Sequence, residues 1–451
     1  MKQKVLDYFY KISQIPRSTF CEKAVADYIC QFAKEHNLEF VKDKFNNVLI
    51  NKIVDISKPI TVLQSHLDMV CIKEPDYNFD FSSQPLTLKI KGDYLFAHKT
   101  SLGADNGIGV AIMLALLEGT NYNIQALFTT DEEVTMTGAQ NFDYSLLKSK
   151  DLISLDGFSD KNMILGCASI CDSKVKLNNA FTMLDGAKQG YKITVSGLKG
   201  GHSGADINKN VGNAVKILGE ILTTFSDVKF DSFEVGNQFN FIPNYGFATF
   251  SAKENINKFE EVCSHLKSKY KSLKIKLEKT KLLKEYSLQF SKSLIDFINS
   301  ILTGVVEKKG NKIILSQNLA SVSLSDNLVK ISSRSHCEKS EQANIKNNEF
   351  LSKKYGFSYE IFDKQPGFET SKKCSLAQNL LKASKSLNQK LNCITKHISI
   401  EGCIFKSKMK DANIVVVSPT IKNPHSTKER VYIPSIENTL NLLEKYFKGI
   451  N

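Results

Sequence analysis

Tryptophan is absent from this chain of 451 residues, and only three of its 60 lysine and arginine residues are arginine. The net charge of +13 would suit a protein that binds nucleic acid. Such proteins, however, cluster their basic side chains and interleave them with aromatic ones, whereas the lysines here are spread over the whole chain. This distribution is typical of solvated surfaces, so we expect no nucleic-acid partner.

Long hydrophobic runs are lacking as well. No apolar stretch reaches the roughly 18 residues that would make it a candidate membrane helix. Residues 1–5 open an amphipathic pattern without the apolar core of a signal peptide. The ten cysteines are scattered over a long chain without a signal peptide, which favours reduced thiols. Cys167 and Cys171, four positions apart, have no second cysteine pair at a zinc-site spacing, which argues against a metal site at these two cysteines. We therefore expect a cytoplasmic protein with no membrane partner.

The sequence does contain a regular alternation of strands and helices. Its apolar pattern predicts buried strands at 60–64, 124–130 and 152–155, with a helix at 110–118 between the first two. This order is typical of a doubly wound α/β fold. Between residues 191 and 362 the pattern of predicted strands and helices changes. The order of elements in the first part of this region is repeated in the second part, although the two parts have little residue-level similarity.

A chain of this length exceeds one ordinary hydrophobic core, so two domains are expected. We predict a discontinuous α/β domain that consists of residues 1–188 and 366–451. Residues 189–365 are predicted to form an inserted α+β domain with two similar halves.

Histidine and acidic side chains follow the predicted strands. They are His66 and Asp68 after strand 60–64, Asp131, Glu132 and Glu133 after strand 124–130, Asp156 after strand 152–155, and His425 after strand 414–418, while Asp105 lies in the glycine-rich stretch 100–109 at a helix entrance. Ligands of α/β folds gather at the carboxyl ends of strands. Taken alone, Asp105 would be a helix cap and each histidine a surface or structural residue. Together these residues indicate a pair of metal ions with Asp105 as the bridge.

These residues stand in stretches that resemble the aminoacyl-histidine dipeptidases, also called carnosinase-type or cytosol non-specific dipeptidases. They belong to the wider clan of di-zinc aminoacylases, carboxypeptidases and dipeptidases. The matching stretches, in family order, are 66–70, 102–109, 132–133, 197–204, 401–403, 419–421 and 424–426. The chain departs from the family at Phe239, where an arginine is usual, and at Ile398 and Ser399, which replace small residues beside His397. These departures leave the substrate preference open and do not touch the metal ligands.

The resemblance implies a ligand set for two divalent metal ions. Asp105 bridges them, His66 and Asp156 complete one site, and Glu133 and His425 complete the other. Two imidazoles and three carboxylates suit zinc, with cobalt or manganese as alternatives.

The resemblance also implies roles in catalysis. Asp68 would hold the second ring nitrogen of His66, and Glu132 would be the general base that activates a metal-bridging water. His202, from the inserted domain, would stabilise the tetrahedral oxyanion, in its own subunit or in a partner's. The inserted domain would accordingly serve as a lid and as the contact of a homodimer. The ordinary alternatives are a solvated turn at Glu132 and Glu133 and a flexible loop at 200–202.

Substrate contacts are the last set that the resemblance implies. Arg334 would bind the terminal carboxylate of the substrate as a planar bidentate donor, which lysine cannot copy, and Asn240 would assist it. His397 and Glu401 would line the pocket, with Glu401 holding the free amine. For Arg334 a surface ion pair is the alternative explanation.

The implied activity is that of a metallo-dipeptidase that hydrolyses dipeptides with a free amino terminus, Xaa-His among them. A tripeptidase or an aminoacylase of the same clan is the alternative among enzymes, and a preference for blocked amino termini would favour the aminoacylase. Outside enzymes, the alternative is a catalytically silent peptide-binding protein on the same fold. The intact ligand set and Glu132 argue against that last alternative.

Overall fold

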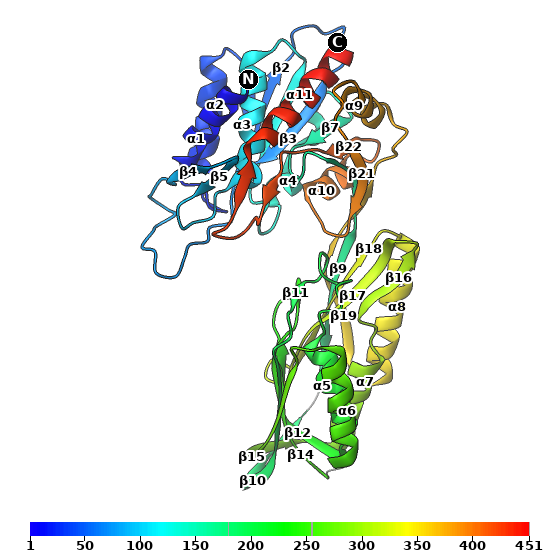
Figure 1. Cartoon of the computed structure of the whole chain (residues 1–451). Helices are drawn as coiled ribbons and strands as arrows, with labels where there is room; N and C mark the ends of the chain where they lie inside the picture. Colours follow the sequence, from blue (N-terminus) through cyan, green and yellow to red (C-terminus); the bar gives the residue numbers. More distant parts are fainter. Residues whose placement is uncertain (179, 254–255, 451) are drawn as a thin grey trace. The chain divides into compact units, whose positions relative to one another are not determined.

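The computed structural model describes residues 1–178, 180–253 and 256–450. The chain divides into two compact units, one of which is discontinuous: Met1–Cys167 with Phe368–Asn451 form the first unit, and Ala168–Gly367 form the second. Each unit contains one nine-stranded sheet and its own helices (Figure 1). The predicted class, an α/β fold with an inserted α+β domain, is thereby confirmed.

The first unit is organised around a mixed sheet. In spatial order its strands are β1 (Glu39–Lys42), β2 (Val48–Lys52), β6 (Ile124–Thr129), β3 (Thr61–His66), β7 (Asp151–Ser154), β22 (Asn413–Val416), β8 (Asn162–Cys167) and β20 (Phe368–Glu369), and β21 (Asn392–Lys396) also pairs with β8. β3 lies in the middle and pairs in parallel with both β6 and β7. Parallel central strands have both faces covered, and all six residues of β3 are buried.

Helices cover both faces of this sheet. They are α1 (Lys2–Ser13), α2 (Lys23–Glu35), α3 (Ala104–Gly119), α9 (Ser375–Ser386) and α11 (Ile433–Ile450) around one hydrophobic cluster, and α4 (Thr137–Asn141) and α10 (Glu401–Lys408) around another. Successive strand residues point to opposite faces, so Leu63 belongs to the first cluster and Val62 to the second. Helix α3 is apolar all round and is buried from Ala104 to Leu117, which places its entrance next to the central strands.

A smaller sheet and a short helix complete the first unit. The small sheet has the order β23 (Ile421–Lys422), β24 (Arg430–Tyr432), β5 (Tyr94–Ala97) and β4 (Leu88–Lys91), and Tyr144–Leu146 form a 3-10 turn. Through the pairing of β24 with β5, this small sheet connects residues 421–432 to the segment that precedes the glycine-rich stretch 100–109. In the part of the chain that the structure describes, no helix has both the length and the apolar character needed to cross a membrane.

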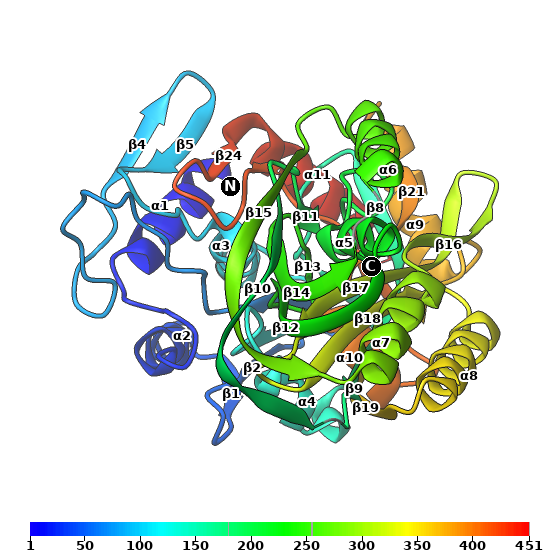
Figure 2. The same ribbon diagram turned by 90° about the horizontal axis from the view of Figure 1, so that it is seen from below.

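The second unit contains an antiparallel sheet with helices on one face. Its strands lie in the order β15 (Lys274–Tyr286), β10 (Phe181–Ser196), β14 (Gly246–Lys253), β12 (Ser226–Gly236), β17 (Lys312–Ser323), β18 (Leu328–Ser335), β9 (Ser169–Lys176) and β19 (Ser358–Gln365), with β16 (Gly304–Lys309) paired to β17. The helices α5 (Ala214–Leu222), α6 (Ile256–Lys269), α7 (Leu288–Ser300) and α8 (Glu338–Lys354) lie beside one another along it (Figure 2).

The two halves of this sheet have the same order of elements. In each half the order is strand, helix, two strands, helix, strand. The elements of one half are β10, α5, β12, β14, α6 and β15, and those of the other are β9, α7, β17, β18, α8 and β19. β12 and β17 pair where the halves meet, and β15 and β19 form the outer edges. Because the first strand of the second half, β9, precedes the first half in the sequence, the unit begins at Ala168 and not at the predicted residue 189.

Candidate metal centre

The central strands deliver the candidate ligands to one edge of the first sheet. His66 is the last residue of β3 and is 1% exposed. Glu132 and Glu133 follow β6, and Asp156 follows β7. Since β6 and β7 run parallel to β3 on its two sides, all four side chains leave the sheet at the same end. This is the arrangement that the strand-end argument predicts.

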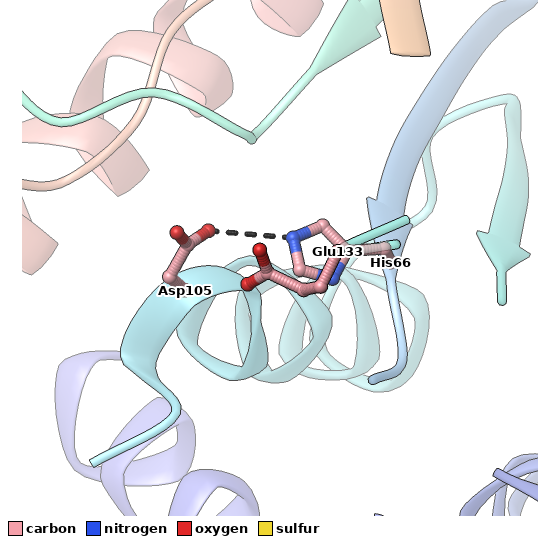
Figure 3. A group of neighbouring side chains, drawn as sticks. All are labelled: His66, Asp105 and Glu133. Carbon is pink, nitrogen blue, oxygen red and sulfur yellow. Dashed lines mark hydrogen bonds and ion pairs between the residues drawn. The ribbon is translucent and has the colours of Figure 1, made fainter. Parts of the chain in front are cut away.

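Asp105 lies between two imidazole rings. Its Oδ1 atom is 3.3 Å from Nε2 of His66, and its Oδ2 atom is 3.1 Å from Nε2 of His425. Nε2 of His425 is also 3.1 Å from Oε2 of Glu133. Figure 3 shows Asp105, at the start of α3, facing His66 beside Glu133. One carboxylate with an oxygen toward each imidazole has the disposition of a bridging ligand.

The donor atoms of this cluster fit divalent metal ions. One ligand atom each from His66, Asp105 and Glu133 lies within 4.8 Å of the other two. Oε1 of Glu133 is buried and has no hydrogen-bond partner among the described residues. Such an orphaned carboxylate oxygen, surrounded by nitrogen and oxygen donors without thiolate, suits zinc, cobalt or manganese. Oδ1 of Asp156 lies 3.9 Å from Nε2 of His66 and extends the same set.

The electrostatics of the cluster favour an added positive charge. Burial raises the pKa of Asp156 to about 7, and the neighbouring charge of Asp105 adds to this effect. Burial likewise raises the pKa of Glu133, with Asp105 again contributing. Burial alone would lower the pKa of His425, but its hydrogen bonds to Asp105 and Glu133 raise that pKa to about 11. Crowded carboxylates that bind protons this strongly are the environment in which a cation is stabilised.

Asp68 contacts both His66 and the acidic turn that follows β6. Its Oδ1 atom is 3.4 Å from Nδ1 of His66, and the fully buried carboxylate also accepts hydrogen bonds from the backbone N–H groups of Glu132, at 3.1 Å, and Glu133, at 3.2 Å. Thr19 Oγ1 donates to it at 2.9 Å. Burial alone would raise the pKa of Asp68, but the hydrogen bond with His66 and the other donors hold it below its usual value. One carboxylate therefore ties the end of β3 to the acidic turn.

Two further buried charged residues contact the backbone of the glycine-rich stretch 100–109. Arg17 and Glu429 are each 2% exposed, and both hydrogen-bond to the backbone around Asp105. No motif of the sequence indicated a role for Arg17 or for Glu429. Two signals could have pointed to them: an arginine in a chain that uses lysine almost everywhere, and an acidic residue four positions after His425.

Glu401 and His397, which were predicted to line the substrate pocket, belong to the first unit. Glu401 begins α10 and is 1% exposed; its Oε2 atom accepts hydrogen bonds from Gln64, at 2.6 Å, and Thr129, at 2.7 Å. Its other oxygen has no hydrogen-bond partner within the described chain. Burial raises the pKa of Glu401 to about 8. His397 follows β21 and is partly buried.

The predicted residues of the second unit gather around Ser203. Arg334, on β18, is 4% exposed, and its Nη2 atom donates to Ser203 Oγ at 3.4 Å. The backbone N–H of Ser203 donates to the carbonyl of Asn240 at 2.7 Å. His202 precedes Ser203 and, in β11 (Gly201–His202), pairs with β13 (Phe241–Ile242). Residues more than 100 positions apart in the sequence thus form one cluster within this unit.

The hydrogen bonds of His202 define the state of its ring. Nδ1 accepts the backbone N–H groups of Gly204 and Ala205, each at 3.1 Å. A nitrogen that accepts two N–H groups carries no proton, so the proton of the neutral imidazole resides on Nε2. The ring is therefore held as a hydrogen-bond donor through Nε2.

Phe239, the departure from the family pattern beside Asn240, forms an aromatic pair. Its ring stacks on Phe362 with centroids 5.7 Å apart and an interplanar angle of 8°. Lys174 Nζ lies 3.2 Å from the centroid of Phe362. Lys330 Nζ lies 5.7 Å from the centroid of Phe239 itself, so an aromatic ring with one cationic neighbour stands at the position of this departure from the family pattern.

Comparison with known proteins agrees with this geometry. The chain is 30% identical to the cytosol non-specific dipeptidase of Escherichia coli (strain K12), over 99% of this chain and 98% of that protein. The crystal structure of the aminoacylhistidine dipeptidase from Vibrio alginolyticus matches with a TM-score of 0.85 and 26% identity, over 99% of this chain and 96% of that one. A tripeptidase from Staphylococcus aureus shares the fold, with a TM-score of 0.59 and 16% identity over 99% of this chain and 98% of that one.

The family model extends over both units. The model described as peptidase family M20/M25/M40 matches residues 62–449, a range that begins within β3 and ends within α11. This match covers the strand ends, the glycine-rich bend and the 419–429 segment as well as the inserted unit. The chain therefore belongs to peptidase family M20/M25/M40.

Proposed function

We propose that this chain is a metallo-dipeptidase that hydrolyses dipeptides with a free amino terminus, Xaa-His among them. The observation that carries the proposal is the placement of Asp105 between His66 and His425, in a chain whose relative with 30% identity is a dipeptidase. Family membership supports peptide-bond hydrolysis, and the dipeptidase relatives support the size of the substrate.

Five residues would hold two divalent ions, which we propose to be zinc, with cobalt or manganese able to replace it. His66, Asp105, Asp156, Glu133 and His425 supply nitrogen and oxygen donors only. When bound, the ions would act as Lewis acids toward the scissile carbonyl and would lower the pKa of the attacking water. The orphaned oxygen of Glu133 and the short contacts of Asp105 support this assignment.

Glu132 is the proposed general base. Its Oε2 atom lies 4.0 Å from Nε2 of His66, and its backbone N–H is anchored by Asp68. Burial raises the pKa of Glu132 well above its usual value, and the charge of Asp156 adds to this effect. A carboxylate with a raised pKa can take a proton from the attacking water, hold it, and deliver it to the leaving amine.

The second unit is proposed to recognise the substrate. His202, held as an Nε2 donor, would stabilise the oxyanion that forms at the scissile carbonyl. Arg334 would pair with the terminal carboxylate, because a planar guanidinium donates two parallel hydrogen bonds to a carboxylate. The contacts that link Arg334 and Asn240 to Ser203 support a common role for them.

Further proposals concern the remaining contacts, assembly and location. His397 and Glu401 are proposed to act on the amino-terminal side of the substrate. We propose a cytoplasmic homodimer that forms through the second unit, with His202 acting in its own or in a partner subunit. A relative described as a cytosol dipeptidase supports the location.

A substrate panel tests the activity. The panel contains Xaa-His and other dipeptides, the same dipeptides with an acetylated amino terminus, and matching tripeptides. We expect the highest kcat/KM for free dipeptides. A preference for acetylated substrates would establish an aminoacylase instead, and a preference for tripeptides a tripeptidase. Zinc binding without turnover of any member would establish a silent binding protein.

A further inference from the structure

The carboxylate of Glu429 binds the backbone of the bend that carries Asp105. Its Oε2 atom accepts the N–H groups of Leu102, at 2.8 Å, and Gly103, at 3.0 Å, and its Oε1 atom accepts the N–H of Asp105 at 3.2 Å. Glu429 lies four residues after His425 in the same loop. One buried side chain thus connects the segment of one candidate ligand to the segment of the bridging ligand.

The guanidinium of Arg17 makes the complementary connection. Nη1 donates to the carbonyls of Leu67, at 2.8 Å, and Asp68, at 3.0 Å, the two residues that directly follow His66. Nη2 donates to the carbonyl of Gly103. The backbone carbonyl of Arg17 in turn accepts the N–H of Met69 at 3.1 Å. The end of β3 and the bend are therefore held by the same planar group.

The peptide groups of Gly103 are the point where the two connections meet. Its N–H is bound by Glu429 and its C=O by Arg17. A Cβ atom at Gly103 would lie 2.5 Å from Nη2 of Arg17, and one at Gly107 would lie 2.6 Å from the same atom. Gly103 also has a φ of +65°, which disfavours other residues. The glycines of the bend therefore allow the turn and also leave room for a buried guanidinium.

We propose that Arg17 and Glu429 are positioning residues: together they fix the relative placement of three ligand-bearing segments and so set the affinity for the metal pair. The three segments carry His66, Asp105 and His425, and the inference rests on the ligand set of the proposed function. Glu429 accepts the backbone N–H of Asp105 itself and lies four residues after His425, and Arg17 binds the carbonyls of the two residues that follow His66. A shift of any one segment would open the donor distances on which a metal pair depends.

The chemistry of both side chains matches this role. Arginine presents several donors in a rigid fork, so one group can hold three carbonyls on two segments, which a lysine ammonium on a flexible stem cannot copy. A carboxylate with two oxygens can accept three N–H groups. Both are deeply buried; burial lowers the pKa of Arg17, and the charge of Glu429 opposes this effect. Neither side chain is among the proposed metal ligands or substrate contacts.

The test measures zinc binding by metal-free protein, without substrate. Glu429→Gln keeps the size of the side chain and removes its charge, and Arg17→Lys keeps the charge and removes the fork. Competition with a chromophoric chelator gives the zinc dissociation constant, and thermal unfolding of the metal-free form gives stability. We expect zinc binding to weaken about 10–100-fold in each variant, as for other residues that orient metal ligands. The double variant should lose less zinc-binding free energy than the sum of the losses in the two single variants, since both side chains bind the peptide groups of Gly103.

Glu341→Gln is the matched control. Glu341 is 3% exposed and lies in the second unit, where it pairs with Lys364 at 2.7 Å and accepts a hydrogen bond from Ser169. Its loss should lower the stability of the protein and leave the zinc affinity unchanged. Zinc affinities of Glu429→Gln and Arg17→Lys within twofold of the parent would overturn the inference, even if both variants melted earlier.

A third variant covers the case in which neither charge variant folds. Gly107→Ala leaves both charges in place and presses a methyl group against the guanidinium of Arg17. It should weaken zinc binding, and an unchanged zinc affinity would overturn the inference. The outcome is separable from the proposed function: a parent that binds two zinc ions yet cleaves no dipeptide refutes the dipeptidase but leaves the positioning test intact.

Discussion

The two candidate clusters of this protein are built in different ways. In the first unit, side-chain atoms of His66 and His425 lie 3.1–3.3 Å from the carboxylate of Asp105, beside the ends of the parallel central strands. In the second unit, Arg334 and Asn240 meet through Ser203, by one long hydrogen bond and one backbone hydrogen bond. Contacts between ionisable side chains hold the first cluster together, whereas single hydrogen bonds to Ser203 join Arg334 and Asn240 in the second. Substitutions in the first cluster should therefore affect metal binding and catalysis, and substitution of Arg334 should affect substrate recognition.

The largest expected effect comes from Glu132→Gln, which separates catalysis from metal binding within the first cluster. The substitution keeps the size of the side chain and removes its basicity. Turnover should fall by roughly 10²–10⁴-fold, as is typical of a lost acid–base group, while the zinc content stays at the parent value. Steady-state rates measured beside metal analysis provide the check.

Glu133→Gln is the control for this prediction, because the neighbouring side chain is a proposed ligand. It should lose one metal ion or hold it loosely. If Glu132→Gln loses metal while Glu133→Gln keeps both ions and is merely slow, the two assignments are reversed. Full activity of both variants would make the acidic pair a solvated turn.

A smaller effect is expected from Arg334→Lys, which tests the recognition role of the second cluster. We expect KM for dipeptides to rise roughly tenfold, because a hydrogen-bonded pair between charged groups is lost, while kcat changes much less. Dipeptides with an amidated carboxyl end should show little change. Equal losses on both kinds of substrate would remove Arg334 from carboxylate binding.

The last prediction concerns the stability of the metal-free protein, which should depend on pH, and not its activity. Burial raises the pKa of Asp156 from 3.8 to about 7, so between these values the folded protein holds a proton that the unfolded chain has released. The free energy of unfolding should therefore fall as the pH rises from about 5 to 7, by up to about 1.4 kcal/mol per pH unit from this group. Asp156→Asn should show a shallower decline in denaturant titrations of metal-free protein. An identical slope in both proteins would contradict the raised pKa.

Much of the first unit could be predicted from the sequence because local patterns determine it. Fold class and family are confirmed, and the strands that present His66 and Asp156 lie within a residue or two of their predicted positions. The site roles themselves stay predictions. Helix α11 and strand β12 were not identified. Strand β9 was also missed, although its residues alternate between buried and less buried positions.

The sequence could draw attention to Arg17 and Glu429, but it could not predict what their side chains contact, for a physical reason. Glu429 binds backbone N–H groups more than 320 positions away, and every residue except proline has such a group. Its partners therefore leave no trace in the side-chain pattern. The same holds for Arg17, whose acceptors are carbonyls. Side chains that act on side chains can be inferred from residue types, whereas side chains that hold the backbone require the folded structure.

The most direct test of the metal centre is a zinc titration of metal-free protein, with dipeptide hydrolysis followed against the number of zinc ions bound per chain. Dialysis against a chelator should abolish hydrolysis. Added zinc should restore it to a plateau at two ions per chain, and cobalt or manganese should restore it as well. Undiminished hydrolysis by protein that metal analysis shows to be metal-free would contradict the account.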